Sequence, residues 1–237
     1  MARPPLRATL EASGLPAEKC DVHKLMLGGG FGRRGMTDYV RQAVAIAKQM
    51  PGTPVKLLWS REEDMAHGKY HPVTQCKLTG AFDADNNLTA LHYRLSGQSI
   101  PVLGAPGGAG ERHGSRRVPG RRRQSGEAAI GYSVPNLLVE HSMRNPHVPP
   151  GFWRGVNVNH NAIYLECFMD ELAHSVGQDP LEFRRKLMTK HPKHLAVLNA
   201  VAEKIGWDKP APQGVYRGIA QVHGLCAATS PAPPRSR

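Results

Sequence analysis

The chain has no long hydrophobic run and few cysteines, and each shortage excludes a class of protein. No apolar stretch reaches the roughly 18 residues of a membrane-crossing helix, so no membrane span is expected. The first residues, MARPPLRATLEASG, lack the apolar centre of a signal peptide, so nothing marks this chain for secretion. The four cysteines stand far apart without a Cys-x-x-Cys pair. This argues against a zinc ribbon or an iron–sulfur cluster held by this chain alone.

Acidic residues are outnumbered, since 19 Asp and Glu against 31 Lys and Arg give a formal net charge of +12. Such a balance ordinarily suggests a polyanionic partner. Residues 101–126 and 223–237 supply +5 and +2 of this charge, so the rest of the chain is only mildly basic. A disordered nucleic-acid-binding arm around GSRRVPGRRR is one alternative function. That run, however, holds no aromatic residue on which a base could stack.

Glycine is concentrated in one short stretch, GGGFGRRG at residues 28–35, where five of eight residues are glycine. With so little side-chain bulk, the backbone N–H groups of such a loop can close on a ligand such as a phosphate. A tight turn without a ligand is the plainer interpretation. Gly30, Gly32 and Gly35 also satisfy the G-x-G-x-x-G fingerprint, so a Rossmann-type NAD(P)-binding oxidoreductase is another alternative function.

Alternating apolar and polar residues predict strands on the C-terminal side of this loop. The stretches 71–82 and 88–97 flank DADNN and predict an antiparallel hairpin with a longer loop. Short apolar runs predict further strands over 20–27, 55–59 and 214–222. A Rossmann unit would continue with parallel strand and helix units, so the hairpin weakens the nicotinamide alternative.

Helical spacing of apolar residues predicts the remaining elements. A helix over 36–50 has Thr37 or Asp38 as its N-cap. A strongly amphipathic helix over 157–177 ends at a glycine. Asp179 then precedes a proline and opens another helix, and 194–206 forms one more. The sequence therefore predicts an α+β fold, with a mixed sheet and packed helices.

Long stretches on both sides of residues 101–126 resemble the large molybdenum-binding subunit of the xanthine dehydrogenase and aldehyde oxidase family. They are LGGGFGRRG, VKLLWSREEDMAHGKYHPVTQCKLTGAFDADNNLTAL and RNPHVPPGFWRGVNVNHNAIYLECFMDELAHSVGQDPLEFRRKLM. Within that family the chain is similar to the isoquinoline 1-oxidoreductase beta-subunit type. The resemblance covers most of residues 8–100 and 127–222, and implies a partial molybdopterin-binding region of a molybdenum hydroxylase.

The resemblance implies a role for the glycine loop. In that family a Gly-Gly-x-Phe-Gly loop packs its backbone against the molybdopterin dinucleotide, with the phenylalanine beside the metal. Carried over, this marks Gly29, Gly30, Phe31, Gly32 and Arg33 as expected cofactor-binding residues. The charge of Arg33 is directed toward phosphate or simply solvated.

The resemblance also implies a second loop at GFWRG. Phe152, Trp153, Arg154 and Gly155 are expected near the substrate or the cofactor. Arg154 either orients a substrate carbonyl or ring heteroatom, or forms a structural pair with a carboxylate.

The implied cofactor is molybdopterin cytosine dinucleotide with its molybdenum, and the implied substrates are small aldehydes or N-heteroaromatic compounds. Electrons would leave through iron–sulfur clusters on a small partner subunit, in agreement with the scattered cysteines of this chain. No nucleic-acid partner and no metal held by protein side chains are expected. The chain as it stands is expected in the cytoplasm, while a periplasmic location stays open for a longer parent enzyme.

Parts of the family sequence have no counterpart here. An upstream domain with a Gln-bearing loop and a downstream Gly-x-Gly-Glu motif with the catalytic base are both absent. No catalytic residue is therefore named, and the chain is expected to be a fragment that is inactive alone.

Four parts of the chain are expected. Residues 8–100 form the first part of the molybdopterin-binding region, and residues 127–222 form the second part with the helices. Residues 101–126 form an irregular Arg/Gly/Pro-rich segment, and residues 223–237 a disordered tail. His113 to Arg123, read one base later with permitted codons, gives family-like sequence, so the irregular segment is interpreted as out of frame.

Overall fold

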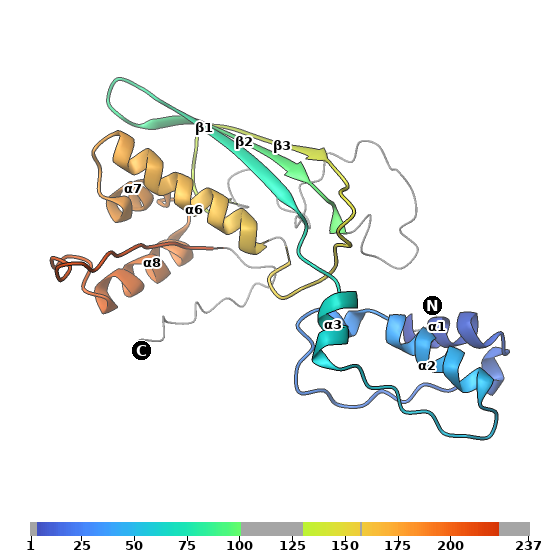
Figure 1. Ribbon diagram of the computed structural model, residues 1–237. Coiled ribbons are helices and arrows are strands. Elements are labelled where there is room, and N and C mark those ends of the chain that lie inside the picture. Colours follow the sequence, from blue (N-terminus) through green and yellow to red (C-terminus); the bar gives the residue numbers. More distant parts are fainter. Residues whose placement is uncertain (1–3, 101–129, 157, 223–237) are drawn as a thin grey trace. The chain divides into compact units, whose positions relative to one another are not determined.

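The computed structural model describes residues 4–100, 130–156 and 158–222, which divide between two compact units (Figure 1). The first unit comprises the chain up to His71, together with Ile100 and Val148–Arg154. The second comprises Pro72–Ser99 and the described residues of 130–147 and from Gly155 onward. The stretch 101–126 and the tail 223–237, singled out by their composition, lie outside the described residues.

The first unit is helical. Its elements are α1 (Pro4–Ser13), α2 (Asp38–Gln49) and α3 (Arg61–His67), with a short 3-10 turn at Arg33–Gly35. Helices α1 and α2 pack side by side (Figure 1). The hydroxyl of Ser60 accepts a hydrogen bond from the Glu63 N–H at 3.2 Å, which caps the first turn of α3. Helix α2 confirms the helix predicted over 36–50, whereas α1 and α3 were not predicted from the sequence.

The second unit contains a three-stranded mixed sheet. Strands β1 (Thr74–Phe82) and β2 (Leu88–Gly97) are antiparallel, and β3 (Asn136–Met143) pairs with β2 in parallel. In the loop between β1 and β2, Asp83 Oδ1 accepts hydrogen bonds from the N–H groups of Asp85 and Asn87 at 3.0 and 2.8 Å. The predicted hairpin is confirmed, and so is the α+β class with a mixed sheet and packed helices.

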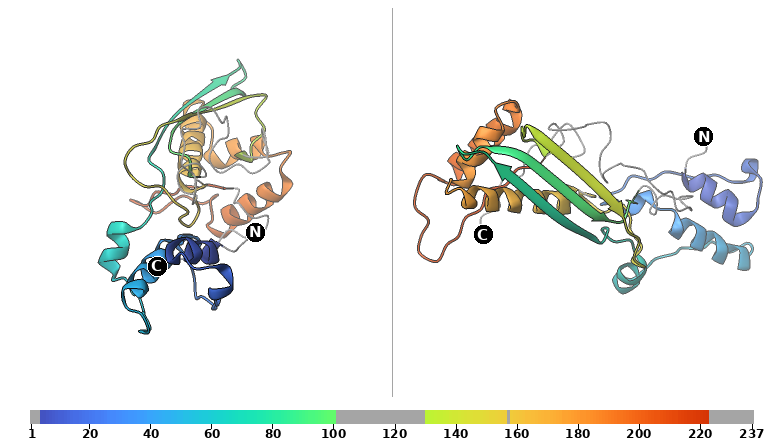
Figure 2. Two further views of the ribbon diagram at one scale, coloured as in Figure 1. Left: turned by 90° about the vertical axis from the view of Figure 1, so that its right-hand side faces the viewer. Right: turned by 90° about the horizontal axis from the view of Figure 1, so that it is seen from above.

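Among the described residues of this unit, three helices pack with the sheet, and their apolar sides contribute to its core. They are α6 (Val158–Ser175), α7 (Pro180–Leu187) and α8 (Pro192–Lys204). Helix α6 runs along one face of the sheet (Figure 2). Leu91 of β2, Met169 of α6 and Leu198 of α8 are all at most 1% exposed within one apolar cluster. The helices predicted from apolar spacing and from the Asp179 cap are therefore confirmed.

The strands predicted over 20–27, 55–59 and 214–222 are wrong, because these residues are described without strand pairing. Met26 is fully exposed, Leu25 is 80% exposed and Leu58 is 76% exposed, so the first two runs are not buried as an interior strand would be, whereas Ile219 of the third run is buried in the core without strand pairing. A strand depends on hydrogen bonds to a neighbouring strand, and an apolar run of three to five residues cannot provide that neighbour itself.

Candidate functional site

The glycine loop folds back on itself immediately before α2. Phe31 and Gly32 both have positive φ angles, of 47° and 92°. The N–H of Arg33 donates to the carbonyl of Gly30 at 2.8 Å, which closes the loop. Left-handed backbone is costly for a residue with a side chain, so Phe31 holds this conformation only because its surroundings impose it. The Phe31 ring is 62% exposed and stands out from the loop.

A second loop, Val148–Arg154, belongs to the same unit and is fixed by the segment that follows α3. The N–H of Tyr70 donates to the carbonyl of Pro149 at 3.1 Å, and the N–H of Gly151 donates to the carbonyl of Tyr70 at 3.0 Å. The His71 ring stacks on Trp153 with centroids 5.2 Å apart. Two backbone hydrogen bonds and one stacked ring pair therefore hold the second loop.

The two loops meet at Gly32. A Cβ atom on Gly32 would lie 1.9 Å from the carbonyl oxygen of Phe152 and 3.1 Å from the N–H nitrogen of Trp153. Only a residue without a side chain permits this approach of two backbones.

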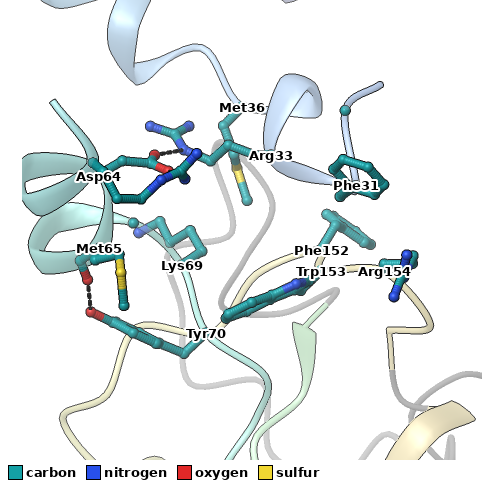
Figure 3. Close-up of a pocket in the computed structure, with 13 residues that line it drawn as sticks. Phe31, Arg33, Met36, Asp64, Met65, Lys69, Tyr70, Phe152, Trp153 and Arg154 are labelled. Atoms are coloured by element: carbon teal, nitrogen blue, oxygen red, sulfur yellow. Dashed lines mark hydrogen bonds and ion pairs between the residues drawn. The ribbon is translucent and has the colours of Figure 1, made fainter. Parts of the chain in front are cut away.

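A cavity of about 480 Å³ lies within this unit, where the two loops and α3 come together (Figure 3). Six of the residues singled out by the sequence line it, namely Gly30, Phe31, Arg33, Phe152, Trp153 and Arg154. Gly29 and Gly32 belong to the same loop, and a Cβ on Gly29 would contact the Phe31 ring at 3.3 Å. Gly155, the remaining residue that the sequence singled out, belongs to the second unit.

All three arginines at this cavity have defined partners, and Arg61 pairs with Asp64 at 3.1 Å. The guanidinium of Arg33 donates to both carboxylate oxygens of Asp38, at 2.8 and 2.9 Å, and to Asp64 at 3.4 Å. The guanidinium carbon of Arg154 lies 5.6 Å from the centre of the Phe31 ring, a cation–π arrangement. The aromatic ring of one loop is thereby paired with the cation of the other.

The ion pair of Arg33 and Asp38 shifts the pKa values of both groups. The hydrogen bond to Asp38 raises the pKa of Arg33 above its ordinary value. Burial alone would raise the pKa of Asp38, but the hydrogen bonds and charge of Arg33 outweigh burial and hold that pKa below its usual value. Both groups therefore stay charged at neutral pH.

Sequence reasoning did not single out Asp64, Lys69 or Tyr70, which also line the cavity. The hydroxyl of Tyr70 donates to the carbonyl of Met65 at 2.5 Å, which fixes its ring at the cavity wall (Figure 3). All three stand in the stretch REEDMAHGKYHP, whose mixture of charged and aromatic residues was the available signal.

Within the part of the chain that the structure describes, no helix is both long enough and apolar enough to cross a membrane.

Comparison with known proteins identifies this arrangement. The sequence model of the family described as "Molybdopterin cofactor-binding domain" matches residues 6–188. The chain belongs to this family. The match includes both loops of the cavity, and the resemblance to the xanthine dehydrogenase family is thereby confirmed.

Curated relatives of this molybdopterin-binding chain agree with the assignment. The chain is 30% identical to a membrane-bound aldehyde dehydrogenase (pyrroloquinoline-quinone) of Gluconacetobacter polyoxogenes, across 89% of this chain and 29% of the relative. It is 25% identical to the isoquinoline 1-oxidoreductase subunit beta of Brevundimonas diminuta, across 87% of this chain and 26% of the relative. The chain thus spans less than a third of the length of these relatives.

A solved structure supports the fold. Quinoline 2-oxidoreductase from Pseudomonas putida 86 superimposes with a TM-score of 0.63 at 19% identity, across 86% of this chain and 27% of that protein. At this identity the likeness establishes the fold alone. The described glycine loop follows residues without strand pairing, which is not the strand, loop and helix context of a dinucleotide fingerprint.

Proposed function

We propose that this chain forms part of the molybdopterin-binding large subunit of a molybdenum hydroxylase, and that the cavity of the first unit lies against the cofactor. The observation that carries the proposal is the convergence of the glycine loop and the Phe152–Arg154 loop on one cavity in a chain of the molybdopterin-binding family. In this proposal the cofactor packs against the loop from Gly29 to Arg33.

The described residues fit such a ligand in size and charge. A cavity of about 480 Å³ is within the usual size of small-molecule sites. Four cationic side chains line it, and the carboxylates of Asp38 and Asp64 pair with two of them, Arg33 and Arg61. This excess of positive charge suits the phosphate groups of a pterin dinucleotide. Gly30 lines the cavity without a side chain, which leaves the backbone of the loop there open to close approach.

The aromatic side chains suggest where a planar group would lie. Phe31 and Trp153 are 62% and 47% exposed, so both rings present apolar faces that a planar ligand can cover. We propose that Arg154, held over the Phe31 ring, directs its N–H donors toward the substrate or the cofactor. The neighbouring Phe152 and Gly155 would hold this loop in place.

When bound, the cofactor supplies the molybdenum centre at which an aldehyde or an electron-poor heteroaromatic carbon is hydroxylated. This chain's residues would bind and orient the cofactor and the planar substrate. We name no catalytic base among them, and we expect no turnover from the chain alone. The cytosine dinucleotide form of the cofactor and a small iron–sulfur partner subunit are parts of the same proposal.

The test is the cofactor content of the full 237-residue chain, purified from a host that synthesises molybdopterin. Molybdenum is measured by elemental analysis, pterin by the fluorescence of its oxidised form, and the nucleotide by chromatography after acid hydrolysis. One molybdenum, one pterin and one cytosine nucleotide per chain are expected. A chain that carries neither pterin nor molybdenum, or that carries a quinone instead, would overturn the proposal.

Two glycine variants make the test specific to the cavity. Gly30→Leu places a side chain at the cavity wall and should lower the pterin content severalfold. Gly28→Leu is the matched control, because Gly28 has no atom within 4 Å of its Cβ position and does not line the cavity. Equal pterin content in the two variants would place the cofactor elsewhere. Circular dichroism of both variants checks that the helices persist.

A further inference from the structure

The glycine loop is followed by two adjacent arginines whose environments differ. The side chain of Arg33 is 24% exposed and donates hydrogen bonds to two carboxylates that come from two different helices. Arg34 is exposed, and its guanidinium carbon lies 6.0 Å from the centre of the Tyr39 ring, a loose contact. Substituting Arg33 and Arg34 one at a time can therefore distinguish a role in holding the loop from a role in binding a ligand.

Arg33 connects three parts of the first unit. Its backbone N–H donates to Gly30 within the loop, and its guanidinium binds Asp38 of α2 and Asp64 of α3. The contact with Asp38 is bidentate, a geometry that a planar guanidinium provides and an ammonium cannot. The Trp59 ring covers the guanidinium carbon at 5.3 Å. These contacts occupy the guanidinium on several sides.

The loop needs such a connection, because its own residues do not fix it. Glycine-rich backbone loses more conformational freedom on ordering than any other, and Phe31 is held in the left-handed region at a cost. A loop of this composition stays in one conformation only if its ends are fastened. Arg33 fastens the C-terminal end, one residue after Gly32 and two after Phe31.

We propose that Arg33 is a positioning residue, which orders the Gly29–Gly32 loop by joining it to Asp38 and Asp64, and that it does not contact the phosphate of a ligand directly. The bidentate pair with Asp38 already balances its single positive charge, and Asp64, which it shares with Arg61, adds a further contact. The inference rests on the proposed function in one respect only, namely that the ordered loop serves to bind the cofactor. The ordering itself does not depend on the cofactor.

The experiment measures hydrogen exchange at the amides of Arg33, Gly35 and Met36, whose hydrogen bonds close the loop and the turn that follows it, together with pterin retention in the full chain. Arg33→Lys keeps the charge but loses the bidentate contact, and Arg33→Ala loses both. Each should accelerate exchange in the loop by about tenfold or more, the loss expected for a hydrogen bond to a charged group. Arg34→Ala is the matched control and should leave exchange in the loop within about twofold of the wild type, as expected of an exposed side chain.

Salt dependence separates positioning from direct phosphate contact. A direct ion contact is screened by salt, so its removal would flatten the salt dependence of pterin release. Positioning predicts that Arg33→Ala releases pterin faster but with the salt dependence unchanged. Normal exchange in Arg33→Lys, rapid exchange in Arg34→Ala, or a flattened salt dependence would each overturn the proposal.

Failure of the proposed function is recognised separately. If the wild-type chain holds no pterin, the exchange experiment still decides whether Arg33 orders the loop. If Arg33→Ala does not fold, Asp64→Ala takes its place, since this variant removes one hydrogen-bond acceptor of Arg33 and leaves the pair with Asp38. It should accelerate exchange in the loop severalfold while the far-ultraviolet circular dichroism stays unchanged. Unchanged exchange in Asp64→Ala would count against the proposal.

Discussion

The carbonyl oxygen of Phe152 occupies the place where a side chain on Gly32 would begin. The distance from that oxygen to an added Cβ is 1.9 Å, and Gly32 itself has a φ of +92°. Backbone contact and backbone conformation thus both require glycine at this position. The two loops of the cavity are held together by this contact, although 120 positions separate Gly32 and Phe152 in the sequence.

Replacing Gly32 with alanine should therefore destabilise the first unit. The left-handed conformation alone costs about 1–2 kcal/mol for a residue with a Cβ, and the clash with a backbone atom adds to it. We expect a loss of at least about 2 kcal/mol in the free energy of unfolding, measured by urea titration. Gly35→Ala is the control, because no atom lies within 4 Å of its Cβ position. Equal stability of the two variants would contradict the contact.

A second prediction concerns the buried ion pair of the second unit. Arg184 of α7 is 0% exposed, and its Nε donates to Glu166 of α6 at 3.0 Å. The same guanidinium donates to Asp170 at 2.6 Å, and the hydroxyl of Tyr132 donates to Glu166 at 2.9 Å. Removing one member of such a pair leaves a buried charge without compensation, which costs about 3–5 kcal/mol.

Arg184→Met should therefore lower the free energy of unfolding by several kcal/mol, as measured by urea titration. Arg185→Met tests the neighbouring arginine, which is 36% exposed and paired with Glu182 on the surface of the same helix. A surface pair contributes about 0–1 kcal/mol, and the Nε of Arg185 also donates to Asn199 at 2.7 Å, so this variant should lose no more than about 2 kcal/mol, clearly less than Arg184→Met. Equal losses in the two variants would show that burial of the pair is not what matters.

The elements that the sequence predicted correctly are those whose signals are local. Helix α6 follows from apolar residues at helical spacing, and α7 from the Asp179 cap before a proline. The hairpin follows from alternation on both sides of the Asp83 turn. Each of these signals lies within about twenty residues, so it can be recognised from the amino-acid sequence alone.

The strands that were predicted wrongly and the contacts that were missed depend on residues far apart in the sequence, whereas α3 was missed although its Ser60 cap is local. The runs at 20–27 and 55–59 are apolar enough for strands, but apolarity does not show whether a pairing strand is available. Likewise, the two loops could be assigned to one cofactor only through resemblance to a family. Arg33 was singled out, but its partner Asp64 stands 31 positions away, and no spacing rule connects them.

The third prediction tests the cap that the sequence indicated. Asp179 Oδ1 accepts hydrogen bonds from the N–H groups of Leu181 and Glu182 at 2.9 and 3.1 Å, and the carboxylate also accepts from the Trp207 indole at 3.1 Å. Asp179→Ala should lower the free energy of unfolding by about 0.5–2 kcal/mol. Asp179→Asn retains an oxygen that can accept from the same N–H groups and should stay close to the wild type. If Asp179→Asn lost as much free energy of unfolding as Asp179→Ala, the charge of Asp179 and not its capping hydrogen bonds would be what stabilises the protein.

The last prediction concerns the reactivity of two cysteines in the second unit. Burial raises the pKa of the Cys76 thiol on β1 to about 11, even though a hydrogen bond with Tyr93 works in the opposite direction. Cys167 lies exposed on α6. Alkylating reagents attack the thiolate, so the rise from 9.0 to about 11 should lower the reactive fraction of Cys76 about a hundredfold at pH 8.

Iodoacetamide labelling at pH 8, followed by mass spectrometry of the peptides, should therefore modify Cys167 early and Cys76 about two orders of magnitude more slowly. Between pH 8 and pH 10 the rate at Cys76 should keep rising about tenfold per unit, because its thiolate fraction is still far from saturation below a pKa of about 11. In urea both cysteines should react at similar rates, because the burial that separates them is lost. Equal rates in the folded chain would mean that β1 is not packed against the core as described.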